Sequence, residues 1–278
     1  MTELEQLGQE PPRDGPPAAV RLTSVGKAFG WGPQRRTVLA RLDLQLPQGG
    51  CLGLVGESGS GKSTLGKIVT GIYRFDAGRL DVMGYTLTPG APRPAALRDQ
   101  VCYIPQNPYA SFDPRKTIGQ SMAEALNPRS MSVARNRDKI TDWLSRVSLP
   151  GDAISRYPHE FSGGQRQRIA IARALSTRPE VVVADEVTSA LDVSVQAEVL
   201  ALLEELRRET SFSMLLISHD LTVVRGVCTD VAVMRAGQIV ETGPTGQVLS
   251  SPGHPYTQQL LSSIPGAPGF SLTEDSAS

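Results

Sequence analysis

Residues 51–65 read CLGLVGESGSGKSTL, an apolar run that passes through a glycine-rich loop into a helix-like pattern. Gly56 to Ser63 fit the spacing G-x-x-x-x-G-K-[ST], which between a strand and a helix is typical of a phosphate-binding P-loop. The glycines let backbone N–H groups turn toward phosphates, and a helix N-terminus favours anionic charge. We expect Lys62 to reach the β- and γ-phosphates of a nucleotide and Ser63 to bind Mg²⁺. The alternative, a glycine-rich turn with an exposed lysine, fits this context poorly.

On this motif, nucleotide binding is assigned to nine consecutive residues: Gly56, Glu57, Ser58, Gly59, Ser60, Gly61, Lys62, Ser63 and Thr64.

Two further apolar runs, at residues 181–184 and 214–217, lack alternation, as expected of strands that are covered on both faces. Helical periodicity follows two of the three runs, in the sets Leu65, Ile68, Ile72 and Val195, Val199, Leu202, Leu206. This alternation of strand and helix predicts an α/β fold around a parallel sheet.

Other regions depart from that alternation. Residues 20–50 and 78–104 are short, glycine-punctuated and β-branched in places, which predicts a flanking antiparallel sheet. Residues 107–178 contain helix-like stretches without a convincing strand, and residues 231–241 fit a hairpin that turns at 235–237. We expect a disordered tail over 1–19, one nucleotide-binding domain over 20–265 with a helical subdomain at about 107–178, and a second disordered tail over 266–278.

Composition narrows the functional class. The 278 residues contain 28 Lys plus Arg and 28 Asp plus Glu, so no global positive field favours nucleic acid as a partner. No apolar stretch approaches the roughly 20 residues of a membrane-spanning helix, and the N-terminus has no signal-peptide pattern. We expect a cytosolic protein that reaches a membrane only through a partner.

Two carboxylates, Asp185 and Glu186, end the second apolar run. P-loop NTPases hold Mg²⁺ with an aspartate at the end of such a strand. We therefore expect Asp185 to hold the metal, together with Ser63, and Glu186 to polarise the water that attacks the γ-phosphate. Without the P-loop, a solvated turn would explain two acidic residues equally well.

The sequence Phe161-Ser-Gly-Gly-Gln165 and its continuation to Leu175 resemble the signature of ABC ATPases. Ser162 and two glycines before a helix make a second anion-binding N-terminus. The resemblance implies that Ser162, Gly163, Gly164 and Gln165 contact ATP bound by a second ATPase subunit. It covers nearly all of residues 20–265, and it implies ATP hydrolysis by an ABC-type α/β fold.

The resemblance also implies roles for four further positions. Phe29 is similar to the aromatic residue that stacks on adenine, with Trp31 as a rival, and Gln106 is similar to the glutamine that senses Mg²⁺ and the attacking water. Asp192 lies in a stretch that resembles the D-loop, and His219 resembles the switch histidine at the γ-phosphate. Val187 stands where many relatives have proline.

Within ABC ATPases, the chain is similar to the dipeptide, oligopeptide and nickel importers, above all at His254-Pro-Tyr-Thr-Gln-Gln-Leu-Leu261. This resemblance implies a second, different ATPase subunit, two integral-membrane permease subunits and, indirectly, a substrate-binding protein. It places the chain peripherally on the cytoplasmic side of the cell membrane. Peptides, nickel and metal chelates all remain open as cargo.

Two other classes compete with a transporter subunit. A soluble ABC ATPase of translation or DNA repair usually fuses two nucleotide domains or inserts a long coiled coil, whereas this sequence has one P-loop and a short insertion. A P-loop kinase of small molecules would leave the signature unexplained.

Overall fold

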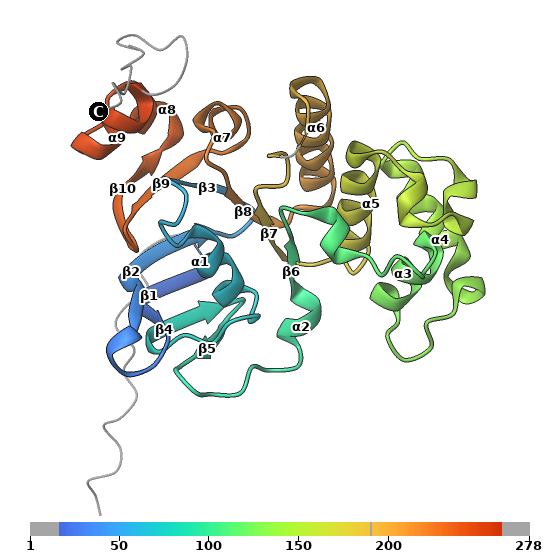
Figure 1. Cartoon of the computed structure of the whole chain (residues 1–278), viewed down its shortest axis with the longest axis horizontal. Coiled ribbons are helices and arrows are strands. Elements are labelled where there is room, and N and C mark those ends of the chain that lie inside the picture. Colours follow the sequence, from blue (N-terminus) through green and yellow to red (C-terminus); the bar gives the residue numbers. More distant parts are fainter. Residues whose placement is uncertain (1–16, 190, 263–278) are drawn as a thin grey trace, which may run out of the picture.

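The computed structural model describes residues 17–189 and 191–262, which form two sheets and a group of helices (Figure 1). The larger sheet has the strand order β10-β9-β3-β8-β7-β6. All its neighbouring pairs are parallel except β9 with β10, which form an antiparallel hairpin. Its strands are β3 (Cys51–Val55), β6 (Val101–Ile104), β7 (Val181–Asp185), β8 (Ser213–Ile217), β9 (Asp230–Arg235) and β10 (Gln238–Pro244). The predicted α/β class is confirmed.

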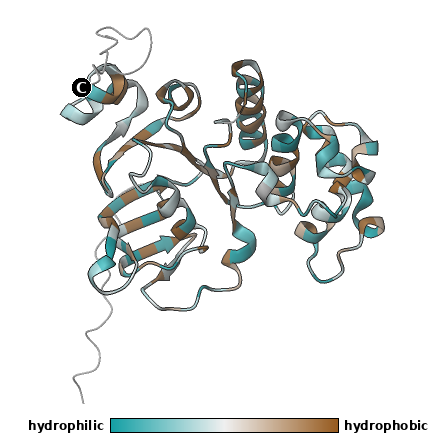
Figure 2. Ribbon diagram, viewed as in Figure 1, coloured by the Kyte–Doolittle hydropathy of each residue, from teal (hydrophilic) through white to brown (hydrophobic). Residues whose placement is uncertain are grey.

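The smaller sheet is antiparallel, in the order β2-β1-β4-β5. Its strands are β1 (Ala18–Phe29), β2 (Arg36–Pro47), β4 (Ala77–Val82) and β5 (Tyr85–Leu87), with the short helix η1 (Gly32–Gln34) between the first two. Figure 2 shows this sheet with alternating hydrophilic and hydrophobic stripes, whereas the central strands of the larger sheet are almost uniformly hydrophobic. The difference follows from burial, because one face of the smaller sheet meets solvent and both faces of the larger one are covered.

Alternate residues of each central strand belong to two separate cores. Leu52 and Leu54 of β3 pack with α1 (Lys62–Val69) and the antiparallel sheet. Cys51 and Val55, on the opposite face, pack with the helices that follow later in the chain. Helices α5 (Gly163–Leu175) and α6 (Val193–Thr210) supply much of this second core.

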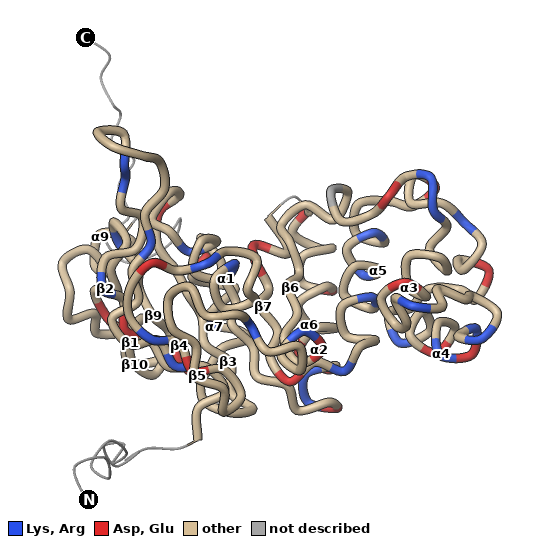
Figure 3. Tube along the Cα trace, turned by 90° about the horizontal axis from the view of Figure 1, so that it is seen from below, with Lys and Arg blue, Asp and Glu red and all other residues tan. Residues whose placement is uncertain are grey.

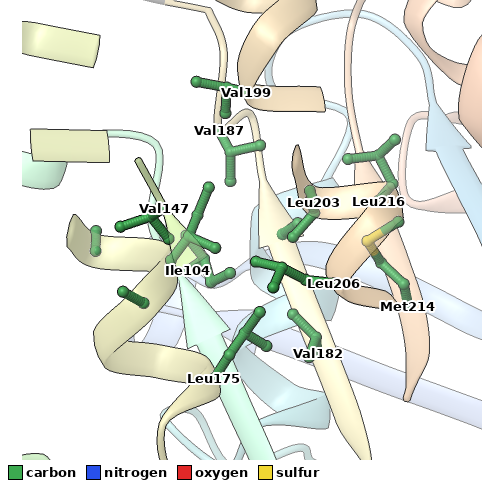
Figure 4. Packing of buried hydrophobic residues seen from close by; sticks show 14 of the residues in the cluster. Ile104, Val147, Leu175, Val182, Val187, Val199, Leu203, Leu206, Met214 and Leu216 are labelled. Carbon is green, nitrogen blue, oxygen red and sulfur yellow. The ribbon is translucent and has the colours of Figure 1, made fainter. Parts of the chain in front are cut away.

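Figure 4 shows the second core at close range, where Val182, Met214 and Leu216 of the sheet meet Leu203 and Leu206 of α6. The side chains interdigitate between sheet and helix. Because both faces of these strands are covered, the strands are apolar at nearly every position.

Between residues 107 and 178 the described chain forms helices and no strand. These are η2 (Pro108–Ser111), α3 (Ile118–Leu126), α4 (Val133–Arg146), η3 (Gly151–Ser155), η4 (Pro158–Glu160) and α5. They extend from the β6 side of the larger sheet (Figure 1). The remaining helices are α2 (Leu97–Gln100), α7 (Leu221–Val227), α8 (Thr245–Ser250) and α9 (Pro255–Ser262).

Three expectations need correction. Residues 101–104 form β6 of the parallel sheet, not part of the antiparallel one, because β6 pairs with β7. Helix α1 ends at Val69, and Ile72 beyond it is 55% exposed, because Gly71 takes a left-handed conformation with φ of 80°. Strand β1 begins at Ala18 and buries Ala19, so the predicted tail over 1–19 is too long. The rest of both predicted tails lies outside the described residues, except Pro17.

Charges of both signs are interspersed along the chain (Figure 3), in keeping with the balanced composition. No helix within the described ranges is long and apolar enough to cross a bilayer.

Candidate active site

The P-loop connects β3 to α1 and is shaped by its glycines. Gly56, Gly59 and Gly61 have φ of 149°, 79° and 108°, which side chains rarely allow. A Cβ atom on Gly56 would also lie 2.0 Å from the carbonyl oxygen of Met234. Gly61 is the N-cap of α1 and provides no side chain to cap the helix, so amides of the first turn stay available to an anion.

Lys62 is almost completely buried and sits inside the loop. Its ammonium group donates to the carbonyl oxygens of Gly56, at 2.7 Å, and Glu57, at 2.8 Å. Burial lowers the pKa of Lys62, and nearby carboxylates, chiefly those of Glu186 and Asp185, oppose that shift. The positive charge therefore faces both acidic residues of β7 and the turn that follows it.

Asp185 accepts two side-chain hydrogen bonds at the end of β7. The Ser63 hydroxyl donates to one carboxylate oxygen at 3.1 Å, and the Tyr103 hydroxyl donates to the other at 2.5 Å. Burial and the contact with Asp185 raise the pKa of Tyr103, so its hydroxyl stays protonated and able to donate. Tyr103 was not expected from the sequence, since a lone tyrosine in β6 belongs to no recognisable motif.

Glu186 follows directly and has a left-handed backbone with φ of 46°, which is uncommon for a residue with a side chain. The Gln106 amide donates to its carboxylate at 2.8 Å, and Nδ1 of His219 lies 3.5 Å from the same oxygen. The Gln106 amide also donates to the Ser189 hydroxyl at 3.1 Å. Three predicted catalytic residues thus meet at one point.

The reason for this meeting is the topology. Gln106 follows β6, Glu186 follows β7, His219 follows β8 and the P-loop follows β3. These strands are parallel, so their carboxyl ends lie at one edge of the sheet, where α/β proteins bind ligands.

The signature lies elsewhere. Ser162 is the N-cap of α5 and forms a reciprocal capping box with Gln165. Helices α1 and α5 lie on opposite sides of β6 in both Figure 1 and Figure 3. The Ser162 side chain is exposed, and Gly163 has room for a Cβ atom, whose nearest neighbour would be Leu191 at 3.8 Å. Gly164 has no such room, because a Cβ atom there would lie 2.5 Å from Val195 of α6.

Three further predicted residues are outside the cluster around Glu186. Asp192 is exposed and begins α6 without a side-chain capping bond. The Phe29 ring packs edge to face against Tyr73, with centroids 5.4 Å apart, and is 39% exposed. Trp31 is 93% exposed, so its whole ring is open to a ligand.

A P-loop whose lysine faces two strand-end carboxylates, with a glutamine and a histidine at the second carboxylate, defines a P-loop ATPase. Residues 39–189 match the ABC transporter family, and residues 240–269 match the oligopeptide/dipeptide transporter C-terminal region. The chain therefore belongs to the ABC transporter ATP-binding proteins, in the oligopeptide/dipeptide importer family, and it is an ATP-hydrolysing cassette.

Individual relatives agree with this family. The chain is 46% identical over 243 residues to the dipeptide transport ATP-binding protein DppF of Haemophilus influenzae, which covers 87% of this chain and 74% of DppF. It is 46% identical over 231 residues to the glutathione import ATP-binding protein GsiA of Escherichia coli, covering 82% of this chain and 37% of GsiA. The dimeric ATP-binding cassette MJ0796, solved in a post-hydrolysis state with ADP and Pi, superposes with a TM-score of 0.72 at 25% identity, over 81% of this chain and 98% of that one.

Proposed function

We propose that this chain forms half of an ATP-sandwiching dimer, in which its signature covers the nucleotide on the partner's P-loop. The observation that carries the proposal is the separation of the two phosphate-binding elements. The P-loop and the carboxylates share one edge of the sheet, while Ser162 and Gly163 begin a helix on the far side of β6 (Figure 1). Ser162 is exposed, and its hydroxyl can donate to an anion while it accepts from the Gln165 N–H of the capping box.

Within the P-loop half, each residue has a distinct task. Glu186 orients and polarises the attacking water, and Gln106 and His219 hold its carboxylate in place while contacting the water and the γ-phosphate. Lys62 neutralises charge on the β- and γ-phosphates. The left-handed backbone of Glu186 is a conformation of the kind that clusters at active sites.

Mg²⁺ fits the oxygen ligands that meet beside the P-loop, the Ser63 hydroxyl and the Asp185 carboxylate, with the Gln106 amide nearby. The described residues include no cluster of three or more His, Cys, Asp or Glu side chains that could hold a metal alone. Bound together with a nucleotide, the metal would supply charge neutralisation on the phosphates.

The helical region connects this site to a permease. Gln106 leads directly into η2, and η2 is bound to the signature helix by two arginines. The Arg166 guanidinium stacks over the Tyr109 ring at 3.7 Å from its centroid, and Arg173 donates to the Ser111 carbonyl at 2.5 Å. Tyr109 is 59% exposed. A motion of the P-loop edge or of the signature helix would therefore move a surface residue that a permease loop could contact.

The partners we propose are a second ABC ATPase subunit, different from this chain, two integral-membrane permease subunits and, indirectly, a substrate-binding protein. The chain would lie peripherally on the cytoplasmic side of the cell membrane. The match over residues 240–269 and the names of DppF and GsiA favour peptides as cargo, with nickel and metal chelates as further candidates. Balanced charge gives no support to nucleic acid as a partner.

The test uses Gly163, because a Cβ atom there would clash with none of the described residues. Gly163→Asp should place a carboxylate against the partner's γ-phosphate, and like charges in a poorly hydrated site repel strongly. In a Glu186→Gln background that retains ATP, light scattering should show ATP-dependent association with the second ATPase subunit for the parent and for Gly163→Ala, but not for Gly163→Asp. ATP binding by the isolated chain should be unchanged. Loss of binding by the isolated, folded Gly163→Asp chain would mean that the signature serves its own P-loop.

The competing function is a soluble ABC ATPase of translation or DNA repair. Co-expression with neighbouring permease genes separates the two, since a transporter subunit should then purify with the membrane fraction and a soluble remodeller should not.

A further inference from the structure

The C-terminal helix α9 reaches the P-loop through one side chain. Tyr256, in its first turn, is 1% exposed, and its hydroxyl accepts a hydrogen bond from the backbone N–H of Glu57 at 3.0 Å. The two residues are 199 positions apart in the chain. The Tyr256 hydroxyl thus contacts the second residue of the phosphate-binding loop.

Several contacts hold the Tyr256 ring and the backbone around it. The guanidinium group of Arg235, at the end of β9, lies 4.8 Å from the ring centroid. The Tyr256 backbone N–H donates to Nδ1 of His254 at 3.1 Å. The Glu241 carboxylate, on β10, accepts from the backbone N–H groups of Gly253, at 2.8 Å, and His254, at 3.2 Å. The start of helix α9 is therefore anchored to the β9–β10 hairpin, next to the point where Tyr256 contacts the P-loop.

Glu57 is bound on both sides of its backbone. Its N–H donates to Tyr256, and its carbonyl oxygen accepts from the Lys62 ammonium at 2.8 Å. Burial raises the pKa of Tyr256, so the hydroxyl stays neutral at physiological pH. Because the same residue holds Tyr256 and Lys62, the orientation of its backbone affects where the lysine lies.

We propose that Tyr256 is a positioning residue for nucleotide binding, which makes helix α9 a structural part of the phosphate-binding site. The hydroxyl holds the start of the loop in its binding conformation before a nucleotide arrives. A loop without this bond must be ordered by the nucleotide itself, at the expense of affinity. The inference rests on the assignment of the P-loop as the nucleotide site.

The experiment measures binding of the fluorescent nucleotide mant-ATP, with Mg²⁺, to the full chain. Tyr256→Phe keeps the ring and removes the hydroxyl, so the chain should fold. Its Kd should rise about fivefold, equivalent to about 1 kcal/mol, the net value of a typical hydrogen bond. KM for ATP should rise in parallel, while kcat at saturating ATP stays within about twofold because the bound loop is the same. The matched control is Tyr85→Phe on the outer strand β5, which removes the same atom and should leave Kd unchanged.

A second variant reaches the hydroxyl indirectly. Glu241→Ala removes the anchor of α9 and should raise Kd in the wild-type background, but add nothing in the Tyr256→Phe background, because both changes act through one contact. An equal rise in both backgrounds would mean that α9 acts by another route, and would overturn the proposal.

An unchanged Kd in Tyr256→Phe, with or without a lower melting temperature, would likewise show that the contact only supports the fold. Lys62→Ala separates this failure from a wrong nucleotide site. If Lys62→Ala loses mant-ATP while Tyr256→Phe does not, the P-loop assignment stands and the positioning role falls. If both bind normally, both assignments fall.

Discussion

The P-loop edge and the signature segment differ in how much of their chemistry this chain satisfies by itself. At the P-loop edge, Lys62 is bound by a carbonyl oxygen of its own loop. Asp185 is bound by Ser63 of α1, and Glu186 by Gln106 from the loop after β6. At the signature, the Ser162 and Gln165 side chains each accept a hydrogen bond from the other's backbone N–H. One region is assembled from several loops of a single chain, whereas the other is held together by hydrogen bonds between neighbouring residues. The difference teaches that P-loop variants should act on an isolated chain, whereas signature variants should require a partner.

The largest effect expected at the assembled edge is on turnover. Glu186→Gln keeps the shape and the contact with Gln106 but loses the charge that polarises water, so turnover should fall by about 100-fold or more. Nucleotide binding should persist. Steady-state ATP hydrolysis by the assembled transporter and mant-ATP binding measure the two effects, and near-normal turnover would contradict the role of Glu186.

A second variant should act on binding instead of chemistry. Lys62→Ala removes a buried ammonium group that would contact the phosphates, and charge-assisted hydrogen bonds of this kind are worth about 1.5–3 kcal/mol. Nucleotide affinity should fall by about 10- to 100-fold in the isolated chain. Isothermal titration with ATP measures this affinity. A loss of affinity seen only when the partner subunit is present would contradict the claim that P-loop variants act on the isolated chain.

The adenine side of the site distinguishes Phe29 from Trp31. Phe29 already packs against Tyr73, while Trp31 is exposed, so stacking on adenine should belong to Trp31 in this chain. Trp31→Ala should weaken ATP affinity by about threefold to tenfold, the range for one aromatic contact, and Phe29→Ala should change it less. Quenching of tryptophan fluorescence by ATP in Phe29→Ala would support stacking on Trp31. If Phe29→Ala weakens ATP affinity more than Trp31→Ala does, Phe29 is the residue that stacks on adenine.

The smallest effect concerns the anchor of α9 and depends on pH. Burial alone would raise the pKa of Glu241, but hydrogen bonds from neighbouring groups, including the Gly253 and His254 amides, outweigh it and lower the pKa below its ordinary 4.5. The stabilisation is therefore complete above the ordinary value and is lost as the pH falls through the lowered one. Glu241→Ala should reduce the free energy of unfolding by about 1 kcal/mol at pH 7, and the difference should vanish in acid. Urea unfolding at both pH values measures it, and a difference that persists in acid would contradict the ionic anchor.

Motif spacing was sufficient to predict the parts of the site that follow strands. Gly56 to Ser63, Asp185 and Glu186 could be assigned to one sheet edge because parallel strands end together. Tyr103 and Tyr256 could not be found in this way. Tyr103 belongs to no motif. Tyr256 lies in the stretch 254–261 that resembles the importer family, but that pattern does not show that the tyrosine contacts a loop 199 positions away.

Packing also decides two points that the sequence alone does not show. Gly164 belongs to the signature pattern, yet its lack of a side chain is required by Val195 of the same chain. Strand β6 is only four residues long, and its sequence gives no sign of which sheet it joins. Both depend on distances between elements far apart in the sequence.

The hydrogen bonds of the Lys62 ammonium group affect how strongly it can bind a phosphate. In the described structure its ammonium group occupies carbonyl oxygens of its own loop, at Gly56 and Glu57. These two carbonyls pair the buried charge within the chain itself. A phosphate that binds Lys62 must therefore compete with acceptors already present, so the affinity that the lysine provides is the difference between two sets of hydrogen bonds.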